Sequence, residues 1–165
     1  GNGPPDDLQR RVGPPGAGGH HEQDAVCAAG FWTFDRQWQG GDVLELELDL
    51  SLLRMAGHPQ IVSTRGRVAL QRGPLVYGFE GLDNGGKPDV VLDSDRGFRV
   101  AHHAALLGGV TVIERGAADG GRWRAIPFYA LANRGASSQT VWVEQQDWAL
   151  PAGWWLGQLY RPMSR

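Results

Sequence analysis

Apolar and polar residues alternate from Asp42 to Leu50, and this is the clearest periodic pattern in the chain. Leucine fills positions 44, 46, 48 and 50, whereas acidic residues fill positions 45, 47 and 49. Successive side chains of a β-strand point to opposite faces, so this pattern is typical of a strand with one apolar and one acidic face. We therefore expect a half-buried strand over residues 42–50.

Other short segments, rich in β-branched and aromatic residues and bounded by glycine, proline, asparagine or serine, also predict strands. They span residues 31–36, 67–71, 75–80, 110–114, 125–131 and 140–144. Gly40-Gly41 predicts a turn, and Pro74 suits a strand start or an edge bulge because proline has no backbone donor. Only Ser51 to Gly57 and Ala101 to Leu107 suggest helices, each about two turns long. Together these elements predict an all-β fold, an antiparallel β-sandwich of jelly-roll-like type.

Composition agrees with this fold class. The chain has 165 residues, 41% of them hydrophobic, which suffices for one ordinary core and is too little to favour two. Its 25 glycines and 10 prolines favour short elements joined by turns. The single cysteine, Cys27, excludes an internal disulfide framework and a multi-cysteine zinc cluster within the chain, so packing must supply the stability.

The expected domain organisation has three parts. Residues 1–30 are rich in glycine and proline and poor in large apolar side chains, which predicts a flexible segment. Residues 31–144 hold the predicted strands and form the sandwich domain. Residues 145–165 form a tail that holds Trp148, Trp154 and Trp155. This tail either folds back on the sandwich or faces a partner.

Charge and hydropathy exclude several partner classes. Sixteen basic and 18 acidic residues give a net charge of -2 without blocks of like charge, so neither nucleic acid nor an anionic membrane is an expected partner. No apolar run approaches the roughly 18 residues that a membrane-spanning helix needs. The first thirty residues lack the charged-then-apolar order of a secretory signal. We expect a soluble protein of undetermined compartment.

The most identifiable motif is Gly66 to Tyr77, GRVALQRGPLVY, followed by Glu80 to Asn84, EGLDN. These residues closely resemble the C-terminal region of glycoside hydrolase family 127, the β-L-arabinofuranosidase-like family. Further segments agree in the same order, and they span residues 31–48, 106–110, 125–135 and 141–142. The resemblance covers residues 31–144 and does not extend to residues 1–30 or beyond Glu144.

The resemblance implies a part of a larger, bacterial-type enzyme in which an (α/α)6 barrel holds the chemistry and β-sandwich domains pack behind it. It implies zinc held by cysteines and a glutamate, a nucleophilic cysteine and a separate acid/base glutamate, all upstream in the barrel. None of the matched segments contains a position of that set, so no catalytic or metal residue is assigned to this chain. The expected function is a non-catalytic accessory sandwich that supports the barrel and is inactive alone.

Several local groups have a structural explanation that outweighs a catalytic one. Glu45 and Glu47 are spaced as a glycosidase carboxyl pair could be, but acids that alternate with leucines are typical of the wet face of a strand. His102 and His103 are adjacent and therefore point in different directions, as surface histidines do. The loop 83–89 does not match the order of a calcium loop, so turn chemistry explains it better.

The densest group of metal-ligand residue types has no zinc spacing either, and it lies in the segment predicted to be flexible: His20, His21, Glu22, Asp24 and Cys27. A nucleophilic role for Cys27 would require a base at a definable distance, and the sequence shows none.

Three residues stay as candidates for contact with a partner or a sugar. Arg72 precedes a strand break and offers a guanidinium for bidentate bonds to carboxylates, so we expect it to help dock the barrel. Trp154 and Trp155 offer flat aromatic faces on which sugars can stack. The alternative functions are therefore a stand-alone carbohydrate-binding module and a self-sufficient enzyme. A homodimer contact is also expected, because a sandwich separated from its barrel would expose an apolar patch.

Overall fold

The computed structural model describes residues 10–13, 25–28, 31–34, 37–46, 48–93, 97–116, 122–146, 148–149 and 158–163. Contacts divide the chain into two compact units, Gly1–Leu50 and Ser51–Arg165. The described residues form strands and short 3-10 helices, which confirms the all-β prediction. None of these helices is long and apolar enough to cross a lipid bilayer. The two compact units are divided after Leu50, which is neither of the predicted boundaries. The boundaries after residues 30 and 144 therefore stay predictions.

The first unit contains two small antiparallel sheets in its described part. Strand β1 (Arg10–Gly13) pairs with β4 (Val43–Leu46), and β2 (Ala25–Ala28) pairs with β3 (Phe31–Phe34). Two of these strands lie within residues 1–30, for which the sequence predicted flexibility; the rest of that stretch is outside the described residues. The turn predicted at Gly40-Gly41 is present, and Gly41 adopts a φ of 96°.

The alternating leucine segment differs from the prediction. Strand β4 ends at Leu46, and residues 48–50 lie outside it. Leu44, Leu48 and Leu50 are 44%, 47% and 38% exposed, so these leucines do not form the buried face that the alternation predicted. The reason is that β4 pairs with β1 in a two-stranded sheet, and such a sheet buries its apolar face only when a second layer packs against it.

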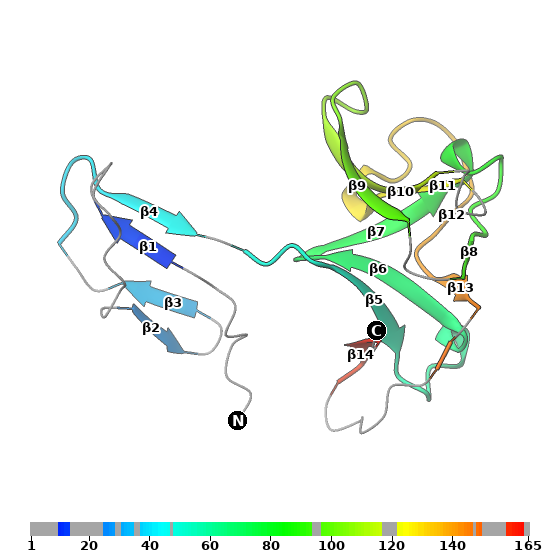
Figure 1. The fold of residues 1–165 in the computed structure, drawn as a ribbon, viewed down its shortest axis with the longest axis horizontal. Coiled ribbons are helices and arrows are strands. Elements are labelled where there is room, and N and C mark those ends of the chain that lie inside the picture. The colour runs from blue at the N-terminus through cyan, green and yellow to red at the C-terminus, as the bar shows by residue number, and fades with distance from the viewer. Residues whose placement is uncertain are drawn as a thin grey trace. The chain divides into compact units, whose positions relative to one another are not determined.

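The second unit is one curled sheet, in which the strands β14, β5, β6, β7, β11, β10 and β9 lie side by side in that order (Figure 1). Their bounds are β5 (Leu52–Gly57), β6 (Arg67–Arg72), β7 (Leu75–Glu80), β9 (Phe98–His103), β10 (Val110–Arg115), β11 (Trp123–Pro127) and β14 (Tyr160–Pro162). The shorter elements are η1 (Val62–Thr64), η2 (Gly81–Asp83), β8 (Val91–Leu92), η4 (Phe128–Ala130), β12 (Gln139–Thr140) and β13 (Val143–Gln145).

The sheet curls because β6 and β7 share only part of their length. They pair at Leu70↔Tyr77 and Arg72↔Leu75, around the hairpin at Gly73. Beyond that point β7 pairs with β12, and the start of β6 pairs with β13, which also runs parallel to β8. The two diverging halves form two layers, and all pairings except that between β13 and β8 are antiparallel.

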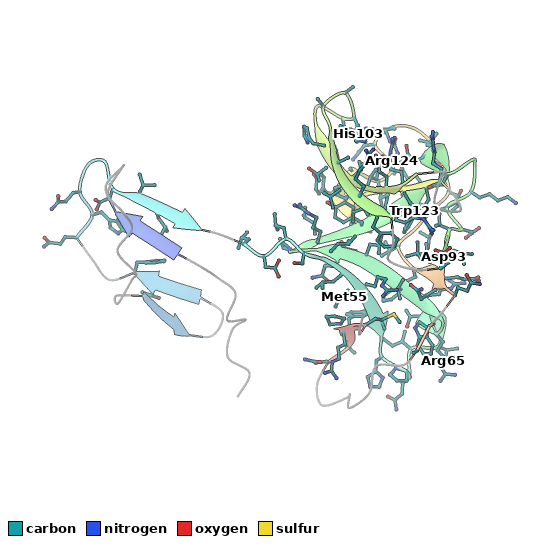
Figure 2. All side chains as sticks on the ribbon, in the orientation of Figure 1. Met55, Arg65, Asp93, His103, Trp123 and Arg124 are labelled. Carbon is teal, nitrogen blue, oxygen red and sulfur yellow. The ribbon has the colours of Figure 1, made fainter. Side chains whose placement is uncertain are left out.

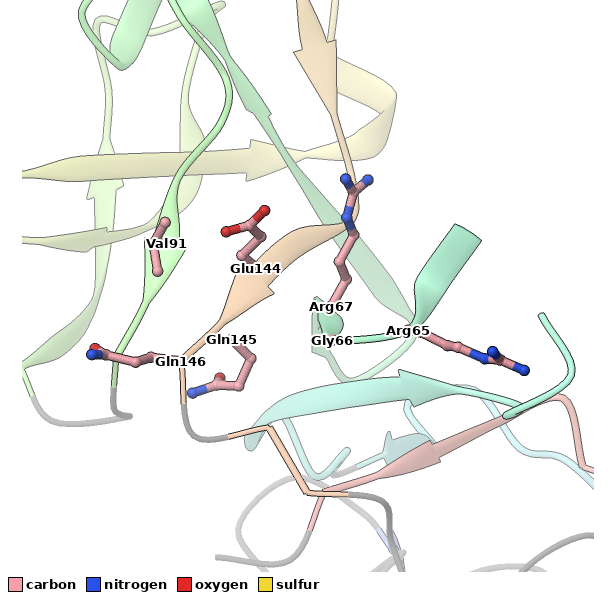
Figure 3. Close-up of a pocket in the computed structure, with 7 residues that line it drawn as sticks. All are labelled: Arg65, Gly66, Arg67, Val91, Glu144, Gln145 and Gln146. Carbon is pink, nitrogen blue, oxygen red and sulfur yellow. The ribbon is translucent and has the colours of Figure 1, made fainter. Parts of the chain in front are cut away.

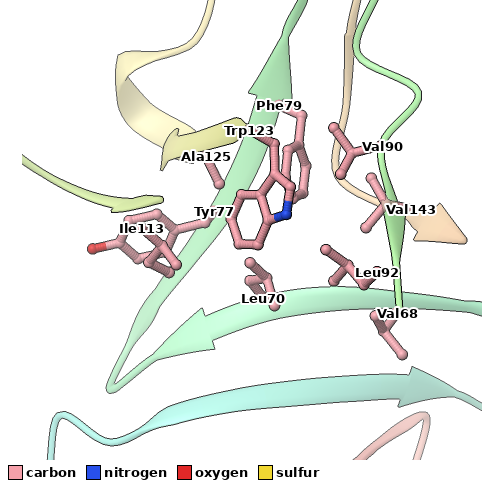
Figure 4. Packing of buried hydrophobic residues seen from close by; sticks show 10 residues of the cluster. All are labelled: Val68, Leu70, Tyr77, Phe79, Val90, Leu92, Ile113, Trp123, Ala125 and Val143. Carbon is pink, nitrogen blue, oxygen red and sulfur yellow. The ribbon is translucent and has the colours of Figure 1, made fainter. Parts of the chain in front are cut away.

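Buried side chains of the second unit form two hydrophobic clusters. The larger one combines residues of β6, β7, β8, β10, β11 and β13, and includes Leu70, Tyr77 and Phe79, all 0% exposed (Figure 4). Burying each such side chain stabilises the fold by about 1.5–3 kcal/mol. Trp123 meets Phe79 and Phe98 edge to face, with ring centroids 5.6 and 4.9 Å apart. The smaller cluster lies on the opposite face of β10 and β11, beneath η4.

The two predicted helices are wrong. Ser51 to Gly57 contains strand β5, and Ala101 to Leu107 contains the end of β9 and a turn. Both segments are short apolar runs, which periodicity alone does not assign to helix or strand. Pairing with β6 and β14 decides the first, and pairing with β10 decides the second.

Candidate functional site

The residues of the EGLDN motif hold a loop against the end of β7. Glu80 ends β7 with a fully buried side chain, and its carboxylate accepts bonds from the backbone N–H of Ala132 and from Arg134. Arg134 also bonds both oxygens of Asp83, with 3.0 Å between Nη1 and Oδ1. The bonds from Asp83 and from Glu80 raise the pKa of Arg134 above its ordinary value, against the effect of burial. The arrangement fastens the loop after η4 to the turn after β7.

Asn84 adds further hydrogen bonds to the turn after β7. Its Nδ2 donates to the carbonyl oxygens of Glu80 at 2.7 Å and Arg124 at 2.9 Å, and its Oδ1 accepts the Arg124 N–H at 2.9 Å. The amide oxygen that a calcium ion would need is therefore already bonded to the backbone. The turn explanation of loop 83–89 agrees with these contacts.

A groove with a volume of about 700 Å³ lies beside Asp83 and contains Glu114. Its lining includes four arginines, Arg99, Arg115, Arg122 and Arg124, and we refer to it as the Glu114 groove. The Glu114 carboxylate accepts bonds from Arg99 and, at 3.3 Å, from Arg124 Nη2, and His103 Nε2 lies 3.4 Å away. Figure 2 labels His103 and Arg124, which approach the groove from β9 and β11.

The charge environment makes Glu114 unsuited to general acid catalysis. The hydrogen bond from Arg99, with help from Arg124 and His103, holds the pKa of Glu114 below its usual range, although burial acts in the opposite direction. A glycosidase acid needs the reverse shift, because it must carry a proton near neutral pH. The second carboxylate in the groove lining, Asp83, is bonded to Arg134 through both oxygens. Both carboxylates in the groove lining are therefore bonded to arginines.

The sequence resemblance assigns zinc to the barrel upstream, and that assignment stays a prediction because it does not concern the described residues. Among them, no three His, Cys, Asp or Glu side chains are grouped as metal ligands. Residues 20–24 and the side chain of Cys27 lie outside the described part.

Arg72, one of the candidates for docking, lies at the turn of the β6–β7 hairpin. Arg72 ends β6 opposite Leu75 and is half-buried. It lies near the Tyr77 hydroxyl. Burial raises the pKa of that hydroxyl, and the positive charge of Arg72 acts in the opposite direction. Gly73 takes the turn with a φ of 54°. Trp154 and Trp155 lie outside the described residues, so the part assigned to them stays a prediction.

The remaining sequence candidates are resolved in part. His102 is exposed and His103 is half-buried on β9, so the two side chains point in different directions as predicted. Trp148 packs against the larger core cluster, so the tail returns to the sandwich at that residue. Trp142 is half-buried and lies with its ring centroid 5.7 Å from that of Tyr160. The side chains of Glu45 and Glu47 lie outside the described part.

Sequence reasoning missed the partners of Glu80. Arg134 follows it by 54 residues, and nothing in either segment reveals that β7 and the loop after η4 meet. A usable signal was the acidic pair Glu80 and Asp83 close to the end of an apolar strand, because buried carboxylates are almost always paired with a cation.

The second unit is thus all-β in its described part, and both carboxylates in the lining of the Glu114 groove are bonded to arginines. Residues 53–144 match the family model described as the glycoside hydrolase family 127 C-terminal domain. The chain belongs to this family.

Three relatives give the scale of the match. The non-reducing end β-L-arabinofuranosidase of Bifidobacterium longum subsp. longum is 34% identical over 123 residues, which cover 57% of this chain and 18% of that protein. The crystal structure of a GH127 β-L-arabinofuranosidase from Geobacillus stearothermophilus T6 is 30% identical, with a TM-score of 0.63, and the match covers 84% of this chain and 25% of that one. A GH127 β-arabinofuranosidase structure is 25% identical with a TM-score of 0.64, covering 84% and 23%. The chain thus spans about a fifth to a quarter of these relatives.

Proposed function

We propose that the chain is a non-catalytic accessory domain that docks against the (α/α)6 catalytic barrel of a longer β-L-arabinofuranosidase-like enzyme. The observation that carries the proposal is the match itself: it falls on the family's C-terminal domain and spans only 18–25% of the enzymes. The state of the Glu114 groove supports it, because both carboxylates in its lining are bonded to arginines.

An exposed aromatic patch beside β7 is the proposed docking surface. Phe128 and Tyr129, both in η4, are 60% and 63% exposed, and Val76 of β7 is 37% exposed. Helix η4 packs over β7. Leu131, the residue after η4, lies so close to Gly78 of β7 that a side chain at Gly78 would have no room. Arg72 lies at the end of the neighbouring strand, where it can meet a carboxylate of the barrel. Exposed aromatic residues next to an arginine are typical of the strongest contacts in interfaces.

The docking test mixes the chain with the rest of its parent polypeptide, produced separately. Binding by calorimetry is expected, and the double variant F128S/Y129S should raise Kd about 30-fold, because buried aromatic anchors contribute 2 kcal/mol or more. V62S is the matched control, since Val62 is 69% exposed on η1. Equal affinity in both variants would contradict this surface.

The catalytic test uses the chain alone. No release of 4-nitrophenol from 4-nitrophenyl β-L-arabinofuranoside is expected. Turnover that persists through purification to homogeneity would overturn the accessory role and support a self-sufficient enzyme.

A further inference from the structure

The EGLDN motif ends in an asparagine that precedes a glycine, Asn84-Gly85. In such a pair the side-chain amide is open to attack by the backbone nitrogen that follows it, because glycine has no side chain to shield that nitrogen. The pair lies in the turn after η2, where Asn84 is half-buried and Gly85 is exposed, with a φ of 67°. The turn therefore holds a reactive dipeptide within reach of water.

The reaction is loss of ammonia from the Asn84 side chain. The nitrogen of Gly85 attacks Cγ of Asn84: the N–Cγ bond forms, the Cγ–Nδ2 bond breaks, and the amide leaves as ammonia with the proton of the Gly85 nitrogen. Water then opens the resulting succinimide ring at either of its carbonyl groups, which leaves aspartate or isoaspartate at position 84. Water is the only co-reactant that these steps require.

The folded turn blocks the first of these steps. Asn84 has a ψ of 42°, which places the Gly85 nitrogen on the far side of the Cα–C bond from Cβ, so it cannot reach Cγ. The amide itself is fixed by bonds from Nδ2 to the carbonyl oxygens of Glu80 and Arg124 and from the Arg124 N–H to Oδ1. The backbone is fixed by the bond from the Gly86 N–H to the Gly81 carbonyl at 2.8 Å. Attack therefore requires the turn to open.

Gln145 provides a contrast within the same unit. Its amide is 5% exposed and accepts a bond from Arg54 Nη1 at 3.2 Å. It belongs to the lining of a polar pocket of about 580 Å³, in which β6 and β13 place Arg67 and Glu144 opposite each other (Figure 3). The residue after it is Gln146, whose side chain shields the backbone nitrogen, and the extra methylene of glutamine makes ring closure slower. Of these two amides, only that of Asn84 is placed to react.

Neither product of the reaction can close the turn as Asn84 does. An ionised aspartate has no donor, so the bonds to the carbonyl oxygens of Glu80 and Arg124 are lost and both oxygens face a carboxylate. An isoaspartate adds an atom to the backbone of a tight turn, in which a Cβ on Gly81 would already lie 2.8 Å from the Gly86 oxygen. Conversion therefore removes the bonds that had prevented it.

We propose that Asn84-Gly85 is a deamidation site that the fold holds inactive, and that conversion makes opening of this turn irreversible. Native proteins open locally, and a chemical step that acts on the open form withdraws molecules from the closed one. The turn also carries Asp83, the partner of Arg134, so its loss releases the loop after η4. The frequency of turn opening thus limits the lifetime of the second unit. This inference does not depend on the docking surface.

The first test follows ammonia loss in the full chain by peptide mass spectrometry, in mildly alkaline buffer with and without concentrated urea. Asn84 should convert at least about tenfold more slowly in the folded chain, because only the opened turn reacts. In urea it should convert at a rate similar to that of Asn2, which also precedes a glycine, while Gln145 stays intact. Equal rates at Asn84 in the folded and unfolded chain, or no conversion in urea, would overturn the proposal.

G81A tests whether opening of this turn controls the reaction. Its Cβ presses on the Gly86 carbonyl, so conversion in the folded chain should rise about fivefold or more, with the rate in urea unchanged. S137A, which removes only the acceptor of the Leu82 N–H, is a milder change and should act in the same direction. G116A is the matched control and should leave the rate within about twofold. If Asn84 converted no faster in folded G81A and S137A than in G116A, the turn would not control the reaction.

N84D imitates one of the products. It should lower the midpoint of thermal unfolding by about 5–10 °C, because the donated bonds are replaced by repulsion between oxygens. N133D adds the same charge but loses a single exposed bond, to the Tyr129 carbonyl, and should lower the midpoint by no more than about 3 °C. Failure of N84D alone to fold would support the proposal, whereas equal midpoints for N84D and N133D would contradict it.

Discussion

Arg134 compensates two carboxylates that are removed from water. It bonds Asp83, which is 7% exposed, and Glu80, which is fully buried, and it is itself 18% exposed. A carboxylate removed from water is unfavourable unless a cation and further hydrogen bonds compensate it, and here Arg134 and the N–H of Ala132 do so. Ala132 adopts a φ of 61°, a conformation that residues with a side chain rarely adopt, so this bond also offsets local strain.

The sandwich should therefore unfold more easily when the Arg134 guanidinium is removed. R134M should lower the free energy of unfolding by about 3–5 kcal/mol, because it leaves the Glu80 carboxylate buried with no cation. Denaturation in urea measures this value. R99M is the matched control: Arg99 is 74% exposed beside Glu114, and its loss should cost no more than about 1 kcal/mol. If R134M and R99M lowered the free energy of unfolding equally, the burial of Glu80 would not explain the effect.

At the scale of elements, hairpin β6–β7 organises the second unit. Each of its strands changes partner along its length, and the new partners, β12 and β13, come from the segment that follows η4. Close backbone approach is needed where these segments meet. A Cβ on Gly81, the first residue of η2, would lie 2.8 Å from the carbonyl oxygen of Gly86 and 3.1 Å from Ser137 Oγ.

The turn after β7 should accordingly reject any side chain at its first residue. G81A is expected to destabilise the fold by about 1–3 kcal/mol, because the carbonyl at Gly86 is backbone and must shift. Thermal unfolding followed by circular dichroism checks this. G116A is the comparison, since a Cβ there meets nothing within 4 Å, and it should change stability by less than about 0.5 kcal/mol. A G81A protein as stable as G116A would mean that the turn relaxes freely.

For the whole molecule, the exposed aromatic residues predict association. Phe128 and Tyr129 lie over half exposed on one short helix, although aromatic side chains usually bury most of their surface. An apolar patch left open on a separated domain tends to bury itself against another copy.

The chain alone should therefore self-associate. In size-exclusion chromatography with light scattering, the apparent mass should rise with protein concentration, and F128S/Y129S should elute closer to the monomer. V62S provides the control for loss of a single exposed apolar side chain. A monodisperse monomer at all concentrations would contradict the predicted self-association. It would also count against the docking surface at Phe128 and Tyr129, from which that prediction follows.

Local patterns were sufficient for several elements. Residues 67–71 and 75–80 become β6 and β7, and 110–114 becomes most of β10, because β-branched and apolar residues between turn signals favour extended backbone. The segment 125–131 is half correct, since β11 ends at Pro127 and η4 follows. The segment 140–144 divides into the end of β12 and the start of β13, each paired with a different strand.

The candidate sites were less accessible to sequence reasoning. Arg67 and Glu144 appear in the sequence as unrelated surface charges, and only the pairing of β6 with β13 places them side by side. Gln145 likewise meets Arg54, 91 residues earlier in the chain, only in the folded structure. A site assembled from strands distant in sequence depends on register, which short-range patterns do not encode.

The amino-acid sequence by itself determined the all-β class and most strands of the second unit, because alternation, β-propensity and glycine or proline turns act over a few residues. Its motif also determined the family. The tertiary structure decided that residues 52–57 form a strand, that Leu44, Leu48 and Leu50 stay exposed, and that Glu80 meets Arg134. These outcomes depend on which segments pack together, and that choice is made by the burial and pairing of the whole domain rather than by any segment alone.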